Sequence, residues 1–313
     1  MSALQRLGIA PAPEPAAAPS ANQAQTGDAF GFKWSRRDTY ESETVGSNMQ
    51  RWLFDRYCGG DRGKLAAWLA GERKIILDAG CGSGYSAMLF FGEHLAHHDY
   101  LGVDISSAVD VARERFKEAG FPGDFLKSDL LKMPVPDGSL DLVFSEGVLH
   151  HTDSTECAIK VLAEKLRPGG RFLFYVYVKK ATIREFTDDH VRRELSGLSD
   201  SEAWSALEPL TKLGIELGRL NVEINVPEDI PYLGIKAGKL DIQRFFYWNI
   251  CKAFYRKDFT LDEMNHINFD WYRPLNCHRH TEQEIRKWCS EGLLDIEHLD
   301  LSESGITVVA LRR

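Results

Sequence analysis

Three glycines at alternate positions, Gly80, Gly82 and Gly84, follow directly after the apolar run 75–77, and a second apolar pattern begins beyond them. This order is typical of a strand that turns sharply into a helix. Glycine permits positive φ angles and lets the backbone approach a ligand closely, and the N-terminus of the following helix offers free N–H groups. The segment therefore predicts a turn that binds a nucleotide.

Two acidic residues follow at the distances that such a site requires. Asp104 ends the apolar run 100–104, about 20 residues beyond the glycines, where an acid at the end of the second strand can accept both ribose hydroxyls. Asp129 ends a further short strand at 125–129. Each acid alone could equally cap a helix or lie in a loop. Their joint order along the chain favours a cofactor site.

The stretch 77–84, L-D-A-G-C-G-S-G, resembles the first motif of class I S-adenosylmethionine (SAM)-dependent methyltransferases, whereas dinucleotide-binding folds have the spacing G-x-G-x-x-G. The segment 139–152 looks like the fourth strand and loop of that family, and 166–175 looks like the turn into its fifth strand. The resemblance covers residues 72–178 and 275–313, and within the family it points to the ubiquinone and menaquinone biosynthesis group.

The resemblance implies SAM as the cofactor. By this likeness the glycines line its methionine end, Asp104 binds the ribose and Asp129 lies near the adenine amino group. Asp78 either contacts the cofactor or orients the glycine loop. The expected cofactor-binding residues are Asp78, Gly80, Cys81, Gly82, Gly84, Asp104, Ile105, Ser128, Asp129, Leu130 and Ser145, with Tyr40 contributed by the N-terminal extension.

The residues just after the fourth strand are the candidates for catalysis. Methyl transfer needs the lone pair of an uncharged acceptor atom in line with the methyl group, and an oxygen acceptor usually needs a base as well. His150 and His151 suit proton removal, because neutral imidazole titrates near the working pH. Glu146 would position the SAM amino group or the acceptor. The alternative is that Leu-His-His at this position is a common structural feature of the group.

A long insertion, residues 179–270, separates the fifth strand from the end of the sheet, and its apolar spacing predicts helices. Because open α/β sheets bind substrates at the carboxyl ends of their strands, we expect this insertion to form a cap that selects the acceptor. It could also form a homodimer interface. No metal site is expected, because the Cys and His residues at 276–280 lack the spacing of a known zinc motif. The expected acceptor-binding residues are Tyr177, Trp271, Tyr272, Arg273, His278 and His280.

Composition adds expectations about partners and location. The formal net charge of −8 argues against nucleic acid as the substrate, since phosphate binding usually needs a basic face. Relatives that methylate planar amines typically have an Asn/Asp-Pro-Pro-aromatic turn after the fourth strand, and here residues 145–148 are Ser-Glu-Gly-Val. Both observations favour a small-molecule acceptor. No apolar run is long enough to span a membrane and no signal sequence is evident, so a soluble, cytoplasmic protein is expected.

The predicted fold is α/β, with a doubly wound seven-stranded sheet of six parallel strands and one antiparallel C-terminal strand, and helices on both faces. Alternating runs at 294–301 and 305–311 predict the terminal hairpin. The expected division is a disordered tail (1–27), a helical N-terminal extension (28–71), the SAM-binding core (72–178), the helical cap (179–270) and the completion of the core (271–313).

The sequence thus predicts a methyltransferase that acts on an oxygen or nitrogen of a small metabolite in a biosynthetic pathway. Three alternatives stay open. Carbon methylation would use the same cofactor, a NAD-dependent oxidoreductase would use a similar sheet, and a noncatalytic partner protein would keep the fold without binding the cofactor. The intact glycine and aspartate positions argue against the last of these.

Overall fold

The structure is a computed structural model that describes residues 2–10 and 18–313. The chain forms two compact units: the first comprises Met1–Ser35, Gly46–Val178 and Asn276–Arg313, and the second comprises Arg36–Val45 and Lys179–Leu275. Each unit buries its own cluster of apolar side chains.

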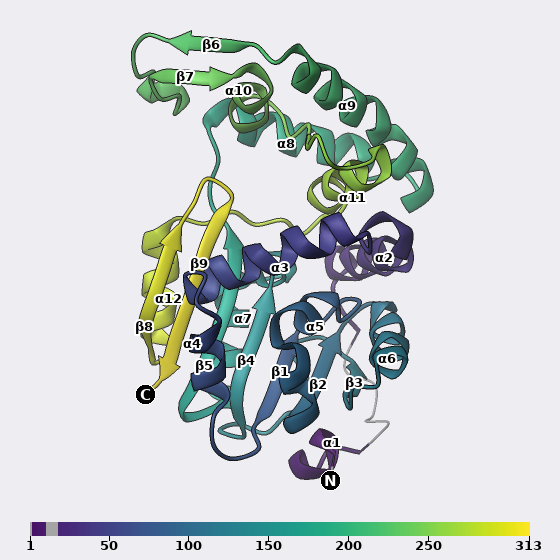
Figure 1. The fold of residues 1–313 in the computed structure, drawn as a ribbon, viewed down its shortest axis with the longest axis vertical. Helices are drawn as coiled ribbons and strands as arrows, with labels where there is room; N and C mark the ends of the chain where they lie inside the picture. The colour runs from purple at the N-terminus through teal and green to yellow at the C-terminus, as the bar shows by residue number, and fades with distance from the viewer. Residues whose placement is uncertain (1, 11–17) are drawn as a thin grey trace. The chain divides into compact units, whose positions relative to one another are not determined.

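The first unit is built on a seven-stranded sheet with the order β3-β2-β1-β4-β5-β9-β8 (Figure 1). Strand β9 pairs antiparallel with both of its neighbours, and every other pair is parallel. Six strands therefore run in one direction and one against them, which confirms the predicted fold class. The strands are β1 (Ile75–Ala79), β2 (Asp99–Asp104), β3 (Asp124–Lys127), β4 (Leu140–Glu146), β5 (Leu166–Tyr177), β8 (Leu294–Leu301) and β9 (Gly305–Arg312).

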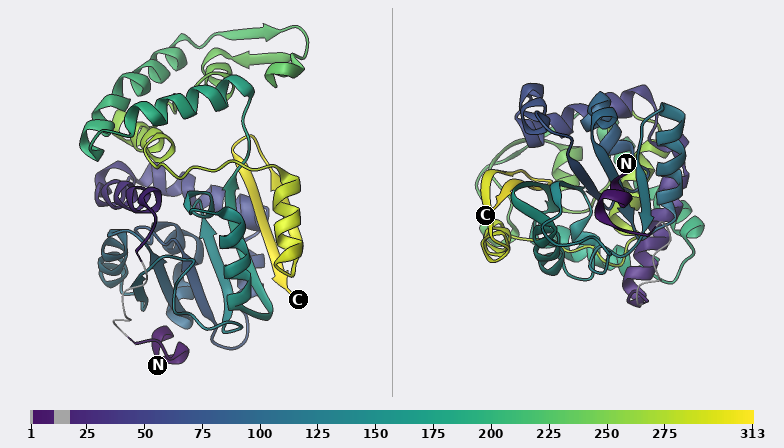
Figure 2. Two further views of the ribbon diagram at one scale, coloured as in Figure 1. Left: turned by 180° about the vertical axis from the view of Figure 1, so that it is seen from behind. Right: turned by 90° about the horizontal axis from the view of Figure 1, so that it is seen from below.

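Helices cover both faces of this sheet. Helices α4 and α5 lie on the face seen in Figure 1, and α7 and α12 lie on the face seen from behind in Figure 2. Strands β1 and β2 are buried along their whole length because helices cover both faces of the sheet, as is typical of parallel sheets. The helices are α1 (Ala3–Leu7), α2 (Ala21–Ser35), α3 (Glu43–Cys58), α4 (Arg62–Leu69), α5 (Tyr85–Phe91), η2 (Gly92–His97), α6 (Ala108–Ala119), η3 (Leu149–His151), α7 (Thr155–Lys165) and α12 (Glu282–Glu291).

The N-terminal region differs from its prediction. Its Ala- and Pro-rich composition predicted a disordered tail over 1–27, but α1 and the start of α2 lie within it. Leu4 and Ile9 are buried in the main core of the first unit, and the Leu4 N–H donates to Asp124 Oδ2 at 2.8 Å. A few well-placed apolar residues are enough to hold a short helix, and an average over composition hides them. The proline-rich residues 11–17 lie outside the described residues.

The second unit is mainly helical, as predicted for the cap, and also contains a two-stranded antiparallel sheet that the sequence pattern did not predict. The segment 36–45 joins it through a hydrogen-bond contact between Thr39 Oγ1 and His266 Nδ1 at 2.7 Å. Among the described residues, no helix is both long and apolar enough to cross a membrane. The elements of the second unit are η1 (Arg37–Thr39), α8 (Thr182–Leu195), α9 (Asp200–Leu220), β6 (Glu223–Val226), η4 (Pro231–Leu233), β7 (Gly238–Asp241), α10 (Ile242–Asn249) and α11 (Leu261–Tyr272).

Candidate active site

The glycine-rich loop connects β1 to α5 at the carboxyl end of the sheet (Figure 1). Gly80, Gly82 and Gly84 all have positive φ angles, of 82°, 50° and 71°. A Cβ atom on Gly80 would lie 2.2 Å from the Val148 side chain, and one on Gly82 would lie 2.7 Å from the indole of Trp34. Conformation and space therefore both require glycine in this loop.

Ser83, in the middle of this loop, is buried and is anchored by its backbone. Its carbonyl accepts a hydrogen bond from Arg115 Nε at 2.8 Å. Its hydroxyl has no hydrogen-bond partner within the part of the chain that the structure describes. Because a buried polar atom without a partner is costly, a polar ligand at this loop would satisfy it.

Asp104, at the end of β2, holds the glycine loop in place. Its Oδ2 accepts the Gly82 N–H at 2.8 Å, and its Oδ1 accepts the N–H and the hydroxyl of Ser106 at 2.8 and 2.6 Å. Burial raises the pKa of the Asp104 carboxyl, and these hydrogen bonds act against the rise. A carboxylate has about four acceptor positions, so the arrangement leaves room for one ribose hydroxyl where two were expected.

Two other expected cofactor residues brace the sheet. Asp78 is buried within β1, where it accepts the hydroxyl of Tyr100 at 2.7 Å, and burial raises its pKa to about 7. The Ser145 hydroxyl donates to the Ala79 carbonyl at 2.8 Å and ties β4 to β1. Burial also raises the pKa of the Cys81 thiol, so it is protonated at neutral pH.

The turn after β3 places Asp129 beside Asp104. The Ser128 N–H donates to the Asp104 carbonyl at 2.9 Å and continues the pairing of β2 with β3. Asp129 Oδ1 accepts the Leu131 N–H at 2.9 Å, which fixes the carboxylate at the strand end. Leu130 is buried in the core and supports the turn from below.

Helix α2 lies against the loops that follow β1 and β2, and the sequence analysis predicted neither its start at Ala21 nor this packing. A Cβ atom on Gly27 would lie 3.3 Å from Ile105, and one on Gly31 would lie 2.7 Å from Ser107. Trp34, on the same helix, packs against Gly82. Glycines four residues apart share one face of a helix and permit this close approach. That spacing was the available signal, but Gly27 had been assigned to the tail.

Asn276 ties α2 to the loop after β4. Its N–H donates to Thr26 Oγ1 at 3.1 Å, and its side-chain amide donates to Asp153 Oδ1 at 2.9 Å. Its carbonyl lies 2.6 Å from His151 Nδ1. One residue therefore links the helix over the glycine loop with the predicted catalytic histidine.

His150 and His151 are both buried in η3. The ring of His150 lies 3.7 Å from the ring of Tyr177, measured between centroids. Because the Asn276 carbonyl can only accept, the neutral His151 ring carries its proton on Nδ1 and its lone pair on Nε2. His151 is thus held in the tautomer of a base that acts through Nε2.

Glu146, at the end of β4, is bound by two residues of α3 that the sequence did not single out. Arg56 forms an ion pair with its Oε1, and the Tyr57 hydroxyl donates to its Oε2 at 2.6 Å. The Arg56 guanidinium also lies over the ring of Tyr175, 4.0 Å from its centroid. Because donors occupy both of its carboxylate oxygens, Glu146 is better suited to positioning a neighbour than to accepting a proton.

His278 and His280 hold the segment 276–280 against neighbouring loops. His278 Nε2 lies 3.0 Å from the Thr152 carbonyl, and His280 Nε2 lies 2.8 Å from Thr155 Oγ1. Both histidines are therefore engaged in structural contacts within the first unit.

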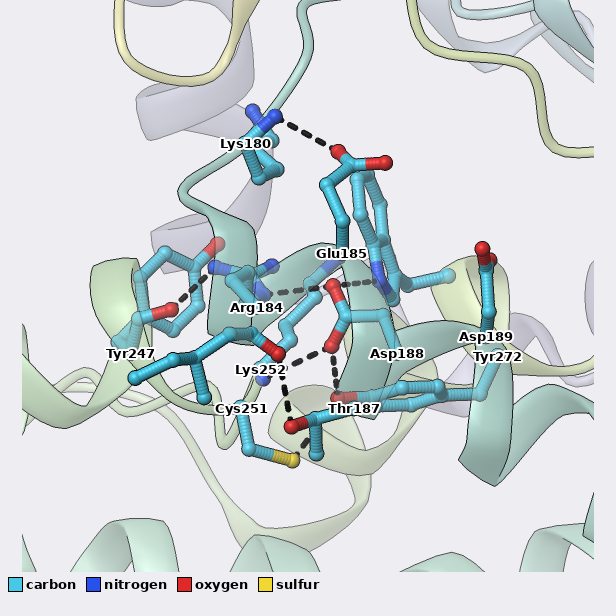
Figure 3. A network of polar contacts seen from close by, with 12 residues as sticks. Lys180, Arg184, Glu185, Thr187, Asp188, Asp189, Tyr247, Cys251, Lys252 and Tyr272 are labelled. Atoms are coloured by element: carbon cyan, nitrogen blue, oxygen red, sulfur yellow. Dashed lines mark hydrogen bonds and ion pairs between the residues drawn. The ribbon is translucent and has the colours of Figure 1, made fainter. Parts of the chain in front are cut away.

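The other residues expected near the acceptor or cofactor lie in the second unit. Trp271 and Tyr272 both donate to the carboxylate of Asp188, at 2.7 and 2.8 Å (Figure 3). Arg273 Nε lies 2.6 Å from Asp200 Oδ1. The ring of Tyr40 lies 5.3 Å from the ring of His266, measured between centroids.

Comparison with known proteins identifies the domain. Residues 77–174 match the methyltransferase domain family. A mouse tRNA (carboxymethyluridine(34)-5-O)-methyltransferase is 33% identical over 132 residues, which cover 41% of this chain and 18% of that protein. A fatty-acid O-methyltransferase of Mycolicibacterium smegmatis is 31% identical over 104 residues, covering 33% and 37%. The chain spans less than half the length of the curated relatives that it matches.

A solved structure is similar along most of the chain. Magnesium protoporphyrin IX methyltransferase from Synechocystis, with bound SAH, aligns with a TM-score of 0.49 and 16% identity, covering 93% of this chain and 100% of that one.

The matched relatives correct the predicted partners. The acidic net charge led us to exclude nucleic acid and to expect a small-molecule acceptor, yet a relative that matches over 132 residues is named as a tRNA methyltransferase. Net charge sums the whole surface and says little about the one face that binds a substrate. The exclusion was therefore wrong. Association of two copies through the cap stays a prediction.

The match, the sheet order and the glycine loop agree with one another. The antiparallel strand β9 also distinguishes this sheet from an ordinary dinucleotide-binding domain, which was the main alternative. The chain therefore contains a class I methyltransferase domain, of the type that uses SAM as its cofactor.

Proposed function

We propose that the protein transfers a methyl group from SAM to an oxygen atom of its acceptor. The observation that carries the choice of cofactor is the glycine loop, which Asp104 holds through the Gly82 N–H and in which the buried Ser83 hydroxyl has no partner within the described residues. This donor set suits a cofactor with a ribose and a charged amino-acid end.

Each part of the first unit would have a distinct role when SAM is bound. The backbone of 80–84 and the Ser83 hydroxyl would bind the methionine end, and Asp104 Oδ2 would accept a ribose hydroxyl. Asp129 would lie at the adenine edge, and α2 would exclude water from the cofactor. Bound SAM supplies a methyl group on a sulfonium, which is electrophilic without any metal.

An oxygen acceptor is supported by the names of two relatives. One is a tRNA methyltransferase whose name specifies 5-O, and the other is a fatty-acid O-methyltransferase. The two names describe very different molecules, but each contains a carboxylic acid group, in one case a carboxymethyl group and in the other a fatty acid.

His151 is the residue best placed to act as the base. A hydroxyl acceptor must lose its proton as the new carbon–oxygen bond forms, whereas a carboxylate acceptor is already ionised at neutral pH and needs no base. Nε2 of His151 holds a lone pair for this proton because Nδ1 faces the Asn276 carbonyl. We expect His151→Gln to reduce methyl transfer to a hydroxyl acceptor by about 100-fold or more, to leave transfer to a carboxylate much less affected, and to leave SAH binding unchanged. His278→Gln is the matched control, because it removes an imidazole engaged with a backbone carbonyl of the same region.

A first assay would use radiolabelled SAM with bulk tRNA and with fatty acids as acceptors. Equal loss of transfer in both histidine variants would contradict a base role for His151.

Cofactor binding is tested by calorimetric titration of the full chain with S-adenosylhomocysteine (SAH) and, separately, with NAD. We expect micromolar binding of SAH and none of NAD. Asp104→Asn should weaken SAH binding by about 100-fold, because it removes a charged acceptor at the ribose. Asp137→Asn is the control, since Asp137 is an exposed acid paired with Lys165. Binding of NAD in preference to SAH would overturn the proposal.

A further inference from the structure

His151, the proposed base, contacts both helix α2 and Asn276. The ring of Phe30, on α2, meets the His151 ring edge to face, with 4.9 Å between the two centroids. The carbonyl of Asn276 lies 2.6 Å from His151 Nδ1. The His151 residue is only 3% exposed, so its ring has little room to turn unless one of these neighbours moves. The position of the His151 proton therefore depends on where α2 and Asn276 lie.

Asn276 also holds the N-terminal half of α2. Its side-chain amide donates to Gln23 Oε1 at 3.3 Å, and its backbone N–H donates to Thr26 Oγ1 at 3.1 Å. The same amide donates to Asp153 Oδ1, which also accepts the hydroxyl of Ser20, the residue before α2, at 2.7 Å. Gln23, Thr26 and Asn276 are buried, so water does not compete for these hydrogen bonds. One residue thus binds both the start of α2 and the proposed base.

Little apolar surface holds α2 against the first unit. Its three aromatic side chains are only half-buried, and its buried residues are all small or polar: Gln23, Thr26, Gly27, Ala29, Gly31 and Lys33. A helix of this kind gains little from the hydrophobic effect and can open at low cost. Its C-terminal half covers the glycine loop, where Trp34 packs against Gly82. The hydrogen bonds of Asn276 are therefore a main attachment of a helix that can open above the cofactor loop.

We propose that Asn276 is a positioning residue that couples the closure of α2 over bound SAM to the tautomer of His151. With α2 closed, the bonds to Gln23 and Thr26 hold Asn276 so that its carbonyl accepts the Nδ1 proton, and the Nε2 lone pair is kept for the acceptor. When α2 opens to exchange the cofactor, these bonds and the Phe30 contact are lost, and the His151 proton can move to Nε2. The base is thus prepared only while the cofactor is enclosed. This inference rests on the proposed function, which supplies the cofactor site and the base.

The tautomer of His151 can be read from the ¹⁵N signals of its ring in protein labelled at histidine, at about pH 8, where an ordinary imidazole is neutral. The signals are assigned by their loss in His151→Gln. In the wild type with saturating SAH, we expect the proton on Nδ1. In Asn276→Ala we expect both tautomers, because the backbone carbonyl remains but the side-chain bonds that hold it are gone. Identical ring signals in the wild type and this variant would overturn the coupling.

The closure of α2 is tested by the rate at which the full chain releases radiolabelled SAH. Asn276→Ala and Thr26→Val should each release SAH about ten-fold faster than the wild type, since each removes hydrogen bonds that hold α2. Thr26→Val keeps the shape of the side chain, so it decides the question if Asn276→Ala does not fold. Asp28→Asn is the matched control, because Asp28 is exposed on the same helix, and it should change neither the release of SAH nor the ring signals.

A purely structural role for Asn276 would give a different result. It predicts a lower melting temperature in Asn276→Ala, with SAH release and the His151 ring signals the same as in the wild type, and that result would overturn the inference. Failure of the proposed function is distinguishable. If the wild type does not bind SAH, the cofactor site and the closure over it are both wrong. If SAH binds and all variants release it at the wild-type rate, the cofactor site stands and the coupling alone is wrong.

Discussion

Asp104 in the first unit and Asp188 in the second are both buried carboxylates, but their hydrogen-bond donors differ in number and in charge. Asp104 accepts three hydrogen bonds from neutral donors and keeps one acceptor position for a ligand. Asp188 accepts four, one of them from the Arg184 guanidinium and one from the Lys252 backbone N–H (Figure 3). Asp104 therefore keeps an acceptor position that a ligand hydroxyl can fill, whereas the acceptor positions of Asp188 are all taken within the protein.

Asp78 extends this comparison, because it is buried with one donor, the Tyr100 hydroxyl. Its pKa is raised to about 7, with burial as the main cause. Among these three acids, we expect a buried carboxylate with several donors to stabilise the fold and a buried carboxylate with a single neutral donor to destabilise it. Substitutions at two of the acids, and in the glycine loop that the third acid holds, test this comparison.

The largest effect is expected for Asp188→Ala. It leaves the buried Arg184 guanidinium without its carboxylate and removes the acceptor of Trp271 and Tyr272, so we expect the second unit to lose about 3–5 kcal/mol of stability. Urea denaturation followed by tryptophan fluorescence measures the loss, with Asp189→Ala as the control, because Asp189 pairs with Arg192 at a partly exposed position. A loss below about 1 kcal/mol would show that the network does not hold the unit together.

Asp78→Asn should have the opposite sign. Because the folded protein raises the pKa of Asp78, its carboxyl binds a proton more tightly when folded, and stability falls as pH rises from about 4 to about 7. The amide cannot ionise, so the variant should gain about 2–4 kcal/mol relative to wild type at pH 8, and clearly less at pH 5. Thermal melts at the two pH values measure this. An identical difference at both would mean that Asp78 does not titrate in this range.

The smallest of these effects concerns the glycine loop that Asp104 holds. Gly82→Ala must tolerate a positive φ angle and a contact with Trp34, and we expect a loss of about 2–3 kcal/mol together with weaker SAH binding. Gly147→Ala is the matched control, since its φ is 74° with nothing within 4 Å, and it should lose only about 1 kcal/mol. Equal losses would show that α2 does not pack tightly on the loop in solution.

The comparison also shows which parts of the molecule the sequence could predict. The sheet order and the glycine loop were predictable because local patterns encode them: the acid-bearing strand ends follow one another in a fixed order. The sequence placed His150 and His151 just after the fourth strand, but it could not show the partner of His151. The Asn276 carbonyl that selects the tautomer of His151 lies 125 residues away in the sequence. No local pattern could have revealed that contact.

Long-range packing also explains the remaining misses. Trp271 and Tyr272 were predicted as acceptor contacts because of their chemistry, but their polar groups are directed to Asp188, 83 and 84 residues away. The start and the packing of helix α2 could not be predicted, because a helix that packs through glycines has little apolar periodicity. In each case the deciding partner comes from a distant segment, which residue type and spacing do not specify.

A crystal structure of the full chain with bound SAH would test the central claim most directly. The account predicts SAH along the glycine loop, with one ribose hydroxyl donating to Asp104 Oδ2 and the Gly82 N–H still bound to the same carboxylate. SAH bound elsewhere, or Asp104 turned away from the ribose, would contradict it.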